Sequence, residues 1–137
     1  MNDTQTEVIA NYCKRHKEVV AVYLFGSRAG NTHTKQSDVD IAVLLKNETV
    51  QFDLLDCIIS LEREFQLPVD AVILNRAGEI LKYQVRLRGV LLYENDALFR
   101  RKFEVRSRKY FEDFQYIHKR YTRDVLYGDI NGRPDVS

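Results

Sequence analysis

The chain has little of what disulfide scaffolds, zinc sites and membrane spans require. Its 137 residues include two cysteines and three histidines. Cys13 and Cys57 fall in apolar, helix-like patterns without the paired spacing of metal ligands, so we expect buried, reduced thiols. The histidines are scattered and have no zinc-site spacing. No apolar run approaches the roughly 20 residues that a membrane-spanning helix needs.

The sequence also shows no pattern that predicts a targeting signal or a further domain. The first four residues have no basic start and no apolar stretch follows them, so we expect no signal peptide and a cytoplasmic location. The sequence contains no internal repeat and no low-complexity segment. Its length suits one hydrophobic core, without a second substrate-binding domain.

The formal net charge is +1, but the charged residues are distributed unevenly along the chain. Residues 100–123 hold nine Lys or Arg against three Asp or Glu, a local balance of +6 that leaves about −5 for the remainder. A basic segment beside an acidic body predicts a charged partner for that segment.

The most informative stretch couples two apolar runs through a polar loop. The first run ends at Gly26-Ser27, and the second opens with Asp38-x-Asp40. Residues two apart in a strand share a face, so Asp38 and Asp40 project together. Neighbouring carboxylates stay ionised only with a cation or hydrogen-bond donors between them, and hard oxygen ligands suit Mg²⁺. Two solvent-facing aspartates at a strand entry are the alternative interpretation.

Gly26 and Ser27 supply the other half of the predicted site. A residue without a side chain lets backbone N–H groups approach a phosphate closely. Ser27 would add a hydroxyl near the start of a helical turn, where anions bind favourably. The pattern therefore predicts a phosphate cradle beside a metal site.

Hydrophobic periodicity predicts helices alternating with strands, and hence an α/β domain. We expect residues 1–94 to form the core, 95–127 a C-terminal helix that completes the same domain, and 128–137 a flexible tail. Helices are expected at 3–16, at 47–65 after a start at Asn47 or Thr49, at 78–88 and at 95–127; strands are expected at 19–25, 38–45, 69–74 and 90–93.

Two further features remain open to interpretation. Asp70 is the only acid in an apolar strand pattern, and such a carboxylate needs a partner unless it is exposed at the strand's first turn. The last helix carries an aromatic and apolar stripe that fits either core packing or a partner surface. The stripe consists of Phe99, Phe103, Tyr110, Phe114, Ile117 and Tyr121.

Gly26-Ser27, ten intervening residues and Asp38-x-Asp40 together resemble the signature of the nucleotidyltransferase superfamily related to DNA polymerase beta. Nearly the whole chain is similar to the smallest members, the MNT-domain (minimal nucleotidyltransferase) antitoxins of HEPN/MNT toxin–antitoxin pairs. The resemblance implies the nucleotidyltransferase fold, a small mixed β-sheet packed against helices.

The resemblance also implies a set of roles. Asp38, Asp40 and Asp70 would be catalytic and would hold two Mg²⁺ ions, while Gly26, Ser27 and Arg28 would bind the nucleotide. The substrate would be ATP, and AMP would pass to a hydroxyl, a tyrosine in the favoured interpretation, of a HEPN-domain ribonuclease toxin.

Three alternatives stay open from the sequence. The protein is a non-catalytic antitoxin that acts by binding, or a small-molecule, aminoglycoside-like nucleotidyltransferase working as a homodimer. A nucleic-acid-modifying enzyme is the least favoured, because acidic residues interrupt the basic segment. A hetero-oligomer with the toxin fits the first interpretation, and a membrane partner fits none of them.

Overall fold

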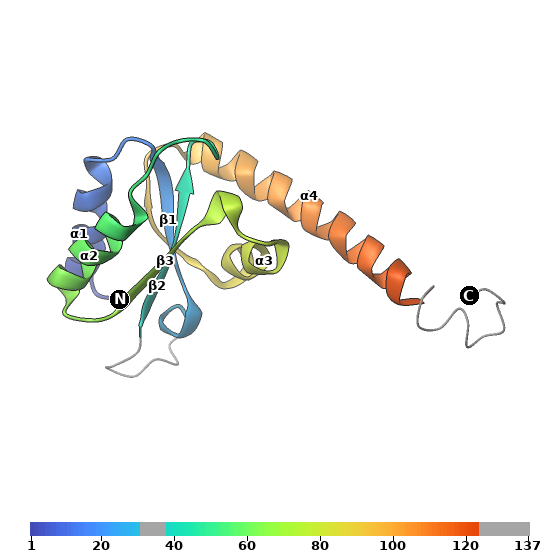
Figure 1. Cartoon of the computed structure of the whole chain (residues 1–137), viewed down its shortest axis with the longest axis horizontal. Coiled ribbons are helices and arrows are strands. Elements are labelled where there is room, and N and C mark those ends of the chain that lie inside the picture. Colours follow the sequence, from blue (N-terminus) through green and yellow to red (C-terminus); the bar gives the residue numbers. More distant parts are fainter. Residues whose placement is uncertain (31–37, 124–137) are drawn as a thin grey trace.

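The computed structural model describes residues 1–30 and 38–123. The chain alternates helices and strands as the periodicity predicts (Figure 1). Its helices are α1 (Asp3–Lys14), α2 (Leu54–Phe65), α3 (Glu79–Arg88) and α4 (Ala97–Thr122), with 3-10 turns η1 (Gly26–Arg28) and η2 (Leu74–Arg76); its strands are β1 (Val19–Phe25), β2 (Val39–Leu45), β3 (Val69–Ile73) and β4 (Val90–Glu94). The expected tail at 128–137 lies outside the described residues.

The four strands form one mixed sheet in the order β3-β2-β1-β4. β1 runs antiparallel to both β2 and β4, and β2 runs parallel to β3. β1 and β2 occupy the centre because their continuous apolar sequences can be buried on both faces. This is the small mixed sheet expected from the sequence.

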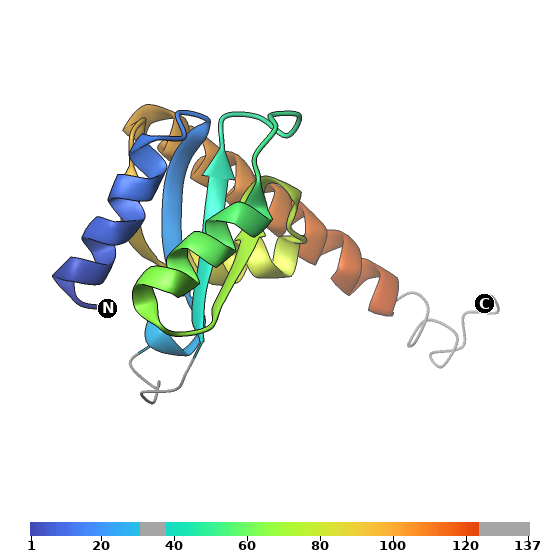
Figure 2. The same cartoon turned by 60° about the vertical axis from the view of Figure 1, so that its left-hand side comes forward.

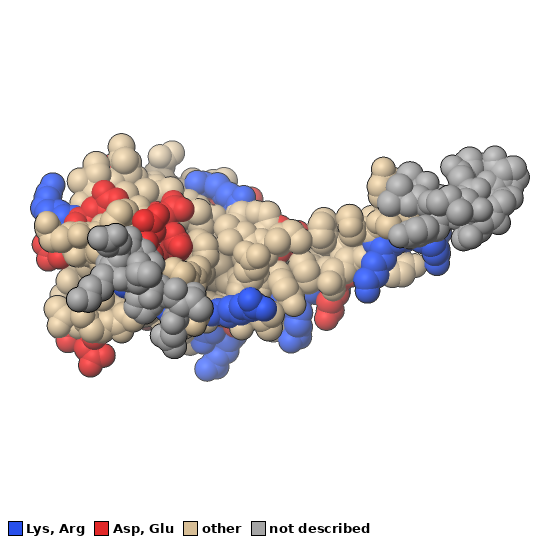
Figure 3. Space-filling view, turned by 90° about the horizontal axis from the view of Figure 1, so that it is seen from below, with Lys and Arg blue, Asp and Glu red and all other residues tan. Residues whose placement is uncertain are grey.

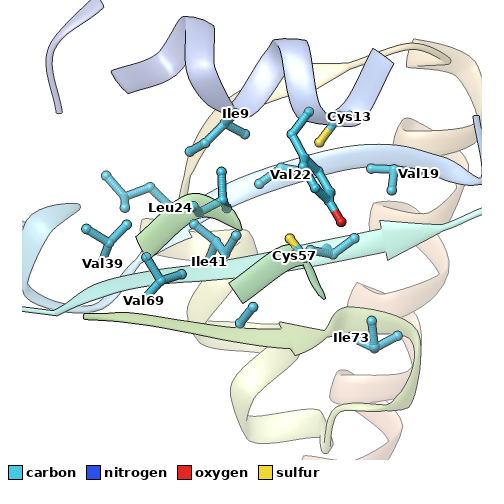
Figure 4. Packing of buried hydrophobic residues seen from close by; sticks show 14 of the residues in the cluster. Ile9, Cys13, Val19, Val22, Leu24, Val39, Ile41, Cys57, Val69 and Ile73 are labelled. Atoms are coloured by element: carbon cyan, nitrogen blue, oxygen red, sulfur yellow. The ribbon is translucent and has the colours of Figure 1, made fainter. Parts of the chain in front are cut away.

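Helices cover both faces of the sheet. α1 and α2 pack on one face, where Ile9, Val22 and Ile41 belong to the larger apolar cluster (Figures 2 and 4). α3 and the first half of α4 pack on the other face, around Tyr23, Leu44 and Val85. Within residues 1–30 and 38–123, no helix combines the length and apolarity of a membrane span.

Cys13 and Cys57 are free and buried, which confirms the prediction from their patterns (Figure 4). Burial is the main reason that the pKa of each thiol rises to about 12. At neutral pH both side chains are therefore neutral thiols that fill space in the core.

Helix starts were the least accurate part of the sequence prediction. The sequence predicts Asp3 or Thr4 as the cap of the first helix, but Asn2 caps α1 by accepting the backbone N–H of Gln5. The expected start of α2 at Asn47 or Thr49 is wrong. The Asn47 side chain instead accepts both the N–H and the hydroxyl of Thr49, a local turn that competes with helix formation.

The apolar stripe of α4 divides into two parts. Phe99 and Phe103 are partly buried and pack against the sheet. Farther along, the helix projects beyond the body of the domain (Figure 1). There the side chains of the same stripe are exposed: Tyr110 by 55%, Phe114 by 40%, Ile117 by 65% and Tyr121 by 62%. The core interpretation holds for the first half of the stripe only.

One residue of α3 departs from the predicted pattern. The helical spacing of residues 78–88 predicts that Ile80 points inward with Leu81 and Val85, but Ile80 is 54% exposed. Val85 is 1% exposed and Leu81 is partly buried against the same cluster. α3 is only ten residues long and presents a narrow apolar face, so a residue next to that face stays in solvent.

Candidate active site

Gly26 follows directly on β1 and approaches the first residues of β2 closely. Its φ of 74° lies in the left-handed region, which side chains with a Cβ rarely adopt. A Cβ at this position would collide with Asp40 Oδ2 and would lie 3.2 Å from Asp40 Cγ. Phe25, the preceding residue, pairs with Asp40 across β1 and β2. The missing side chain thus lets the turn after β1 lie against the Asp40 carboxylate.

Asp40 and Asp70 are brought together by strand pairing. They are Cα partners in the parallel pairing of β2 with β3, so their side chains share one face of the sheet. Asp38 lies just ahead of β2, two residues before Asp40, and its charge acts on the Asp40 carboxylate. This is the face covered by α3 and α4, because Ala42 and Val72, two residues beyond each partner, pack in that cluster.

The three carboxylates influence one another electrostatically. The pKa of Asp40 is raised, first by partial burial and then by the negative charges of Asp70 and Asp38. Asp38 and Asp70 are both exposed, whereas Asp40 is partly buried. Asp70 is therefore not a lone buried charge, and its proximity to Asp40 places a third acid beside the Asp-x-Asp pair.

The carboxylates suit a hard divalent cation by their chemistry. Among residues 1–30 and 38–123, no three His, Cys, Asp or Glu side chains are grouped closely enough to hold a metal ion as they stand. Carboxylate oxygens are nevertheless the ligands that Mg²⁺ prefers. Burial is the first cause of the raised pKa of Asp40, and a cation among these three would offset the second, the repulsion by Asp70 and Asp38.

Ser27 and Arg28 continue the chain from Gly26 in the 3-10 turn η1. Arg28 is only 8% exposed, which is unusual for an arginine. Both residues interact with other groups of the chain. The cationic group of Arg28 is thus held by the structure within two residues of Gly26.

Glu62 is a positioning residue that the sequence did not reveal. Its Oε2 accepts the backbone N–H of Val69 at 2.8 Å, and Val39 N–H donates to the carbonyl of Pro68 at 2.9 Å. These bonds fix the starts of β2 and β3 beside Asp40 and Asp70. In the sequence, Glu62 resembles any acid on the solvent side of a helix, so no signal distinguished it.

The family model described as "Polymerase beta, Nucleotidyltransferase" matches residues 7–98. The chain belongs to the polymerase beta nucleotidyltransferase family. A search of curated proteins found no match. The family assignment agrees with the resemblance identified from Gly26-Ser27 and Asp38-x-Asp40, and the matched range contains all six predicted site residues.

Solved structures of toxin–antitoxin complexes share this fold. A chain of a toxin–antitoxin crystal structure with AMP-PNP has a TM-score of 0.72 and 24% identity, with 92% of this chain and 99% of that chain covered. A chain from the toxin–antitoxin MntA-HepT has a TM-score of 0.67, 23% identity, and coverages of 91% and 99%. A third structure contains a tri-AMPylated Shewanella oneidensis HEPN toxin in complex with its MNT antitoxin. Its TM-score is 0.64 at 23% identity, with coverages of 89% and 98%.

These likenesses establish the fold of the chain. The predicted nucleotidyltransferase fold, with its mixed sheet and long C-terminal helix, is confirmed. The resemblance to MNT antitoxins drawn from the sequence is likewise confirmed at the level of family and fold.

Proposed function

We propose that this protein is an antitoxin that transfers AMP from ATP to a tyrosine hydroxyl of a cognate HEPN ribonuclease toxin and thereby neutralises it. The observation that carries the proposal is the approach of Gly26 to Asp40, with Asp70 in register beside them. Family membership supports nucleotidyl transfer. The similar structures with AMP-PNP and with a tri-AMPylated HEPN toxin support the choice of nucleotide and acceptor.

In this proposal Asp38, Asp40 and Asp70 hold two Mg²⁺ ions, and the turn of Gly26, Ser27 and Arg28 holds the triphosphate. The donor set fits these ions, because Asp40 and Asp70 share one face, Asp38 lies close enough to act on Asp40, and the carboxylate oxygens repel one another without a cation. When bound, Mg²⁺ supplies neutralisation of the triphosphate charge and a lower pKa for the attacking hydroxyl.

The reaction that follows is an in-line displacement at phosphorus. The acceptor oxygen forms a bond to the α-phosphorus, the bond from that phosphorus to the pyrophosphate oxygen breaks, and the hydroxyl proton is released. Backbone N–H groups around Gly26 would face the outgoing phosphates. Arg28, held two residues away, would neutralise negative charge that develops on the pyrophosphate.

The acceptor would be presented by a partner bound along α4. We propose that residues 1–94 form the catalytic core and that the expected C-terminal segment 95–127, which the structure describes as far as residue 123, completes the same domain while offering this surface. The uncovered part of the stripe consists of Tyr110, Phe114, Ile117 and Tyr121, an aromatic composition typical of interface anchors. Lys and Arg side chains project from the same helix, so an acidic partner surface would complement it (Figure 3).

The exposed stripe also favours the second candidate, an antitoxin that acts by binding alone. The two functions differ in their need for the carboxylates. The test measures toxin ribonuclease activity after incubation with ATP, Mg²⁺ and either wild-type protein or the double variant Asp38→Asn, Asp40→Asn. Catalytic neutralisation predicts that the variant still binds the toxin but leaves its ribonuclease active. Equal neutralisation by the variant would establish the binding mechanism instead.

A further inference from the structure

A cavity of about 300 Å³ lies at the opposite end of β2 from the aspartates. Lys46, which follows β2 directly, lines it, whereas Asp40 lies near the start of that strand. Six residues of extended chain separate these positions by ~20 Å. The cavity is therefore separate from the candidate active site, and the proposed AMP transfer makes no use of it.

The floor of the cavity is built from buried polar groups with fixed roles. The Asn75 side chain exchanges two hydrogen bonds with the backbone of Leu45, at 2.8 and 2.9 Å. Ser107 is 5% exposed, and its hydroxyl accepts a hydrogen bond from Arg86 Nη1 at 3.2 Å. These contacts join η2, β2, α3 and α4, so the cavity is formed before any ligand arrives.

Three cationic side chains converge on the cavity from different elements. Lys46 follows β2, Lys82 belongs to α3 and Arg106 to α4. Lys82 Nζ lies 3.6 Å from Glu79 and 5.8 Å from the centroid of the Phe103 ring. Lys46 and Arg106 form no side-chain hydrogen bond or ion pair with any residue of the described ranges. Among the described lining residues Glu48 is the one carboxylate, and Glu79 pairs with Lys82, so the three cations exceed these two carboxylates by one.

Aromatic rings provide the apolar walls. Phe99 and Phe103 are partly buried on α4, and Tyr110 lies farther along the same helix. A cavity with aromatic walls and a surplus of positive charge is complementary to a ligand that joins a planar ring to an anionic group. Nucleotides have this combination, because every base offers a face for stacking and every phosphate accepts hydrogen bonds from Lys and Arg.

We propose that this cavity is a binding site for a nucleoside monophosphate, distinct from the ATP site. The phosphate lies between Lys46 and Arg106, and the base stacks against the aromatic wall formed by Phe99, Phe103 and Tyr110. The volume of about 300 Å³ falls at the lower end of the range for small-molecule sites. A bound nucleotide would join the end of β2 to α4 and so would stabilise the position of the projecting helix.

The test is isothermal titration of the full chain with AMP in the presence of EDTA, which withholds the metal from the three aspartates. We expect binding that weakens at least tenfold in the double variant Lys46→Ala, Arg106→Ala. The matched control is Arg101→Ala, Lys102→Ala, which removes two exposed cations from the same helix outside this cavity. Binding by the control pair should equal that of the wild type.

Several results would overturn the proposal. AMP affinity that survives the Lys46, Arg106 change, or that falls equally in the control pair, would show that the cavity is not the site. Displacement of AMP by inorganic phosphate at equal concentration would show an anion site without a contribution from the rings. Because both replaced side chains are exposed, the wild type and the double variant should have the same melting temperature without ligand. If the double variant melts at a lower temperature, the test uses the single variant Arg106→Gln, which must weaken AMP binding for the proposal to stand.

Discussion

Asp40 and Asp70 occupy paired positions in neighbouring parallel strands, although thirty residues separate them in the sequence. The pairing follows from the register that aligns Val39 with Val69. A slip of one residue would turn Asp70 to the opposite face, among the apolar side chains packed against α1 and α2. The register of β2 with β3 therefore determines whether the third acid reaches the site.

Asp40→Asn should stabilise the protein in the absence of metal. The ionised carboxylate is disfavoured by partial burial and by Asp70 and Asp38, in that order. Solvent reaches much of the group, so we expect a gain below about 1 kcal/mol in the free energy of unfolding at pH 7. Added Mg²⁺ should raise the melting temperature of the wild type but not that of the variant.

The pH dependence of this gain has a definite sign. A raised pKa in the folded state means that the penalty of Asp40 is present above that pKa and fades as pH falls toward the ordinary value of 3.8. The advantage of Asp40→Asn should therefore shrink in acid. Asp113→Asn, at an exposed position on α4, serves as the control and should change little at either pH. If Asp40→Asn were less stable than the wild type at pH 7 without metal, the ionised Asp40 carboxylate would not be disfavoured by burial and by Asp70 and Asp38.

Gly26→Ala should be strongly destabilising. The added Cβ would collide with the Asp40 carboxylate, and the alanine would have to keep the positive φ of Gly26. Together these two effects should lower the free energy of unfolding by about 2–4 kcal/mol. Gly78→Ala is the matched control, because a Cβ there meets nothing within 4 Å, and it should cost less than about 1 kcal/mol. Urea unfolding measures both. Combining Gly26→Ala with Asp40→Ala should recover part of the loss; strict additivity would show that the two residues do not collide.

Tyr23→Phe should loosen the attachment of α4 to the sheet. The buried hydroxyl donates to Glu104 Oε2 at 2.6 Å, and Arg100 also binds Glu104, at 3.0 Å. Losing a hydrogen bond to a charged acceptor should cost about 1.5–3 kcal/mol. Tyr83→Phe removes a hydroxyl that bonds to nothing within the described ranges, while its ring remains 4.2 Å from Phe111. Equal unfolding free energies for the two variants would show that the Tyr23 bond contributes nothing.

Ile117→Ser combined with Tyr121→Ser should leave the fold intact and weaken partner binding. Both side chains are more than 60% exposed on the projecting part of α4. Unfolding should change by less than about 1 kcal/mol, whereas toxin binding should weaken at least tenfold if these are interface anchors. Gln115→Ser, at an exposed position away from the stripe, is the control for surface plasmon resonance. Wild-type affinity of the stripe variant would place the interface elsewhere.

The strands were predicted well from the sequence because short, continuous apolar runs fit few other secondary structures. Residues 19–25 form β1 as expected, and β2 and β3 differ from prediction by one terminal residue each. The Asp-x-Asp pair was visible because strand periodicity alone puts both side chains on one face. Local capping by Asn2 and Asp53 was missed, since several nearby polar residues were equally plausible caps.

Features built from segments far apart in the chain could not be predicted from the sequence. The pairing of Asp40 with Asp70 depends on strand register, and the burial of Arg28 depends on the packing around η1. The cavity beside Lys46 draws its lining from η2, α3, α4 and the segment that follows β2, which no local pattern connects. The stripe of α4 showed the right residues, but only the structure shows where the body of the domain stops covering them.

The central claim is that this chain attaches AMP to its toxin partner. The most direct measurement is the intact mass of the purified toxin after incubation with the protein, ATP and Mg²⁺. The proposed function predicts an added mass equal to one or more AMP units on a tyrosine, and none with the Asp38→Asn, Asp40→Asn variant. An unmodified toxin that nevertheless forms a stable, inactive complex with the wild-type protein would contradict it.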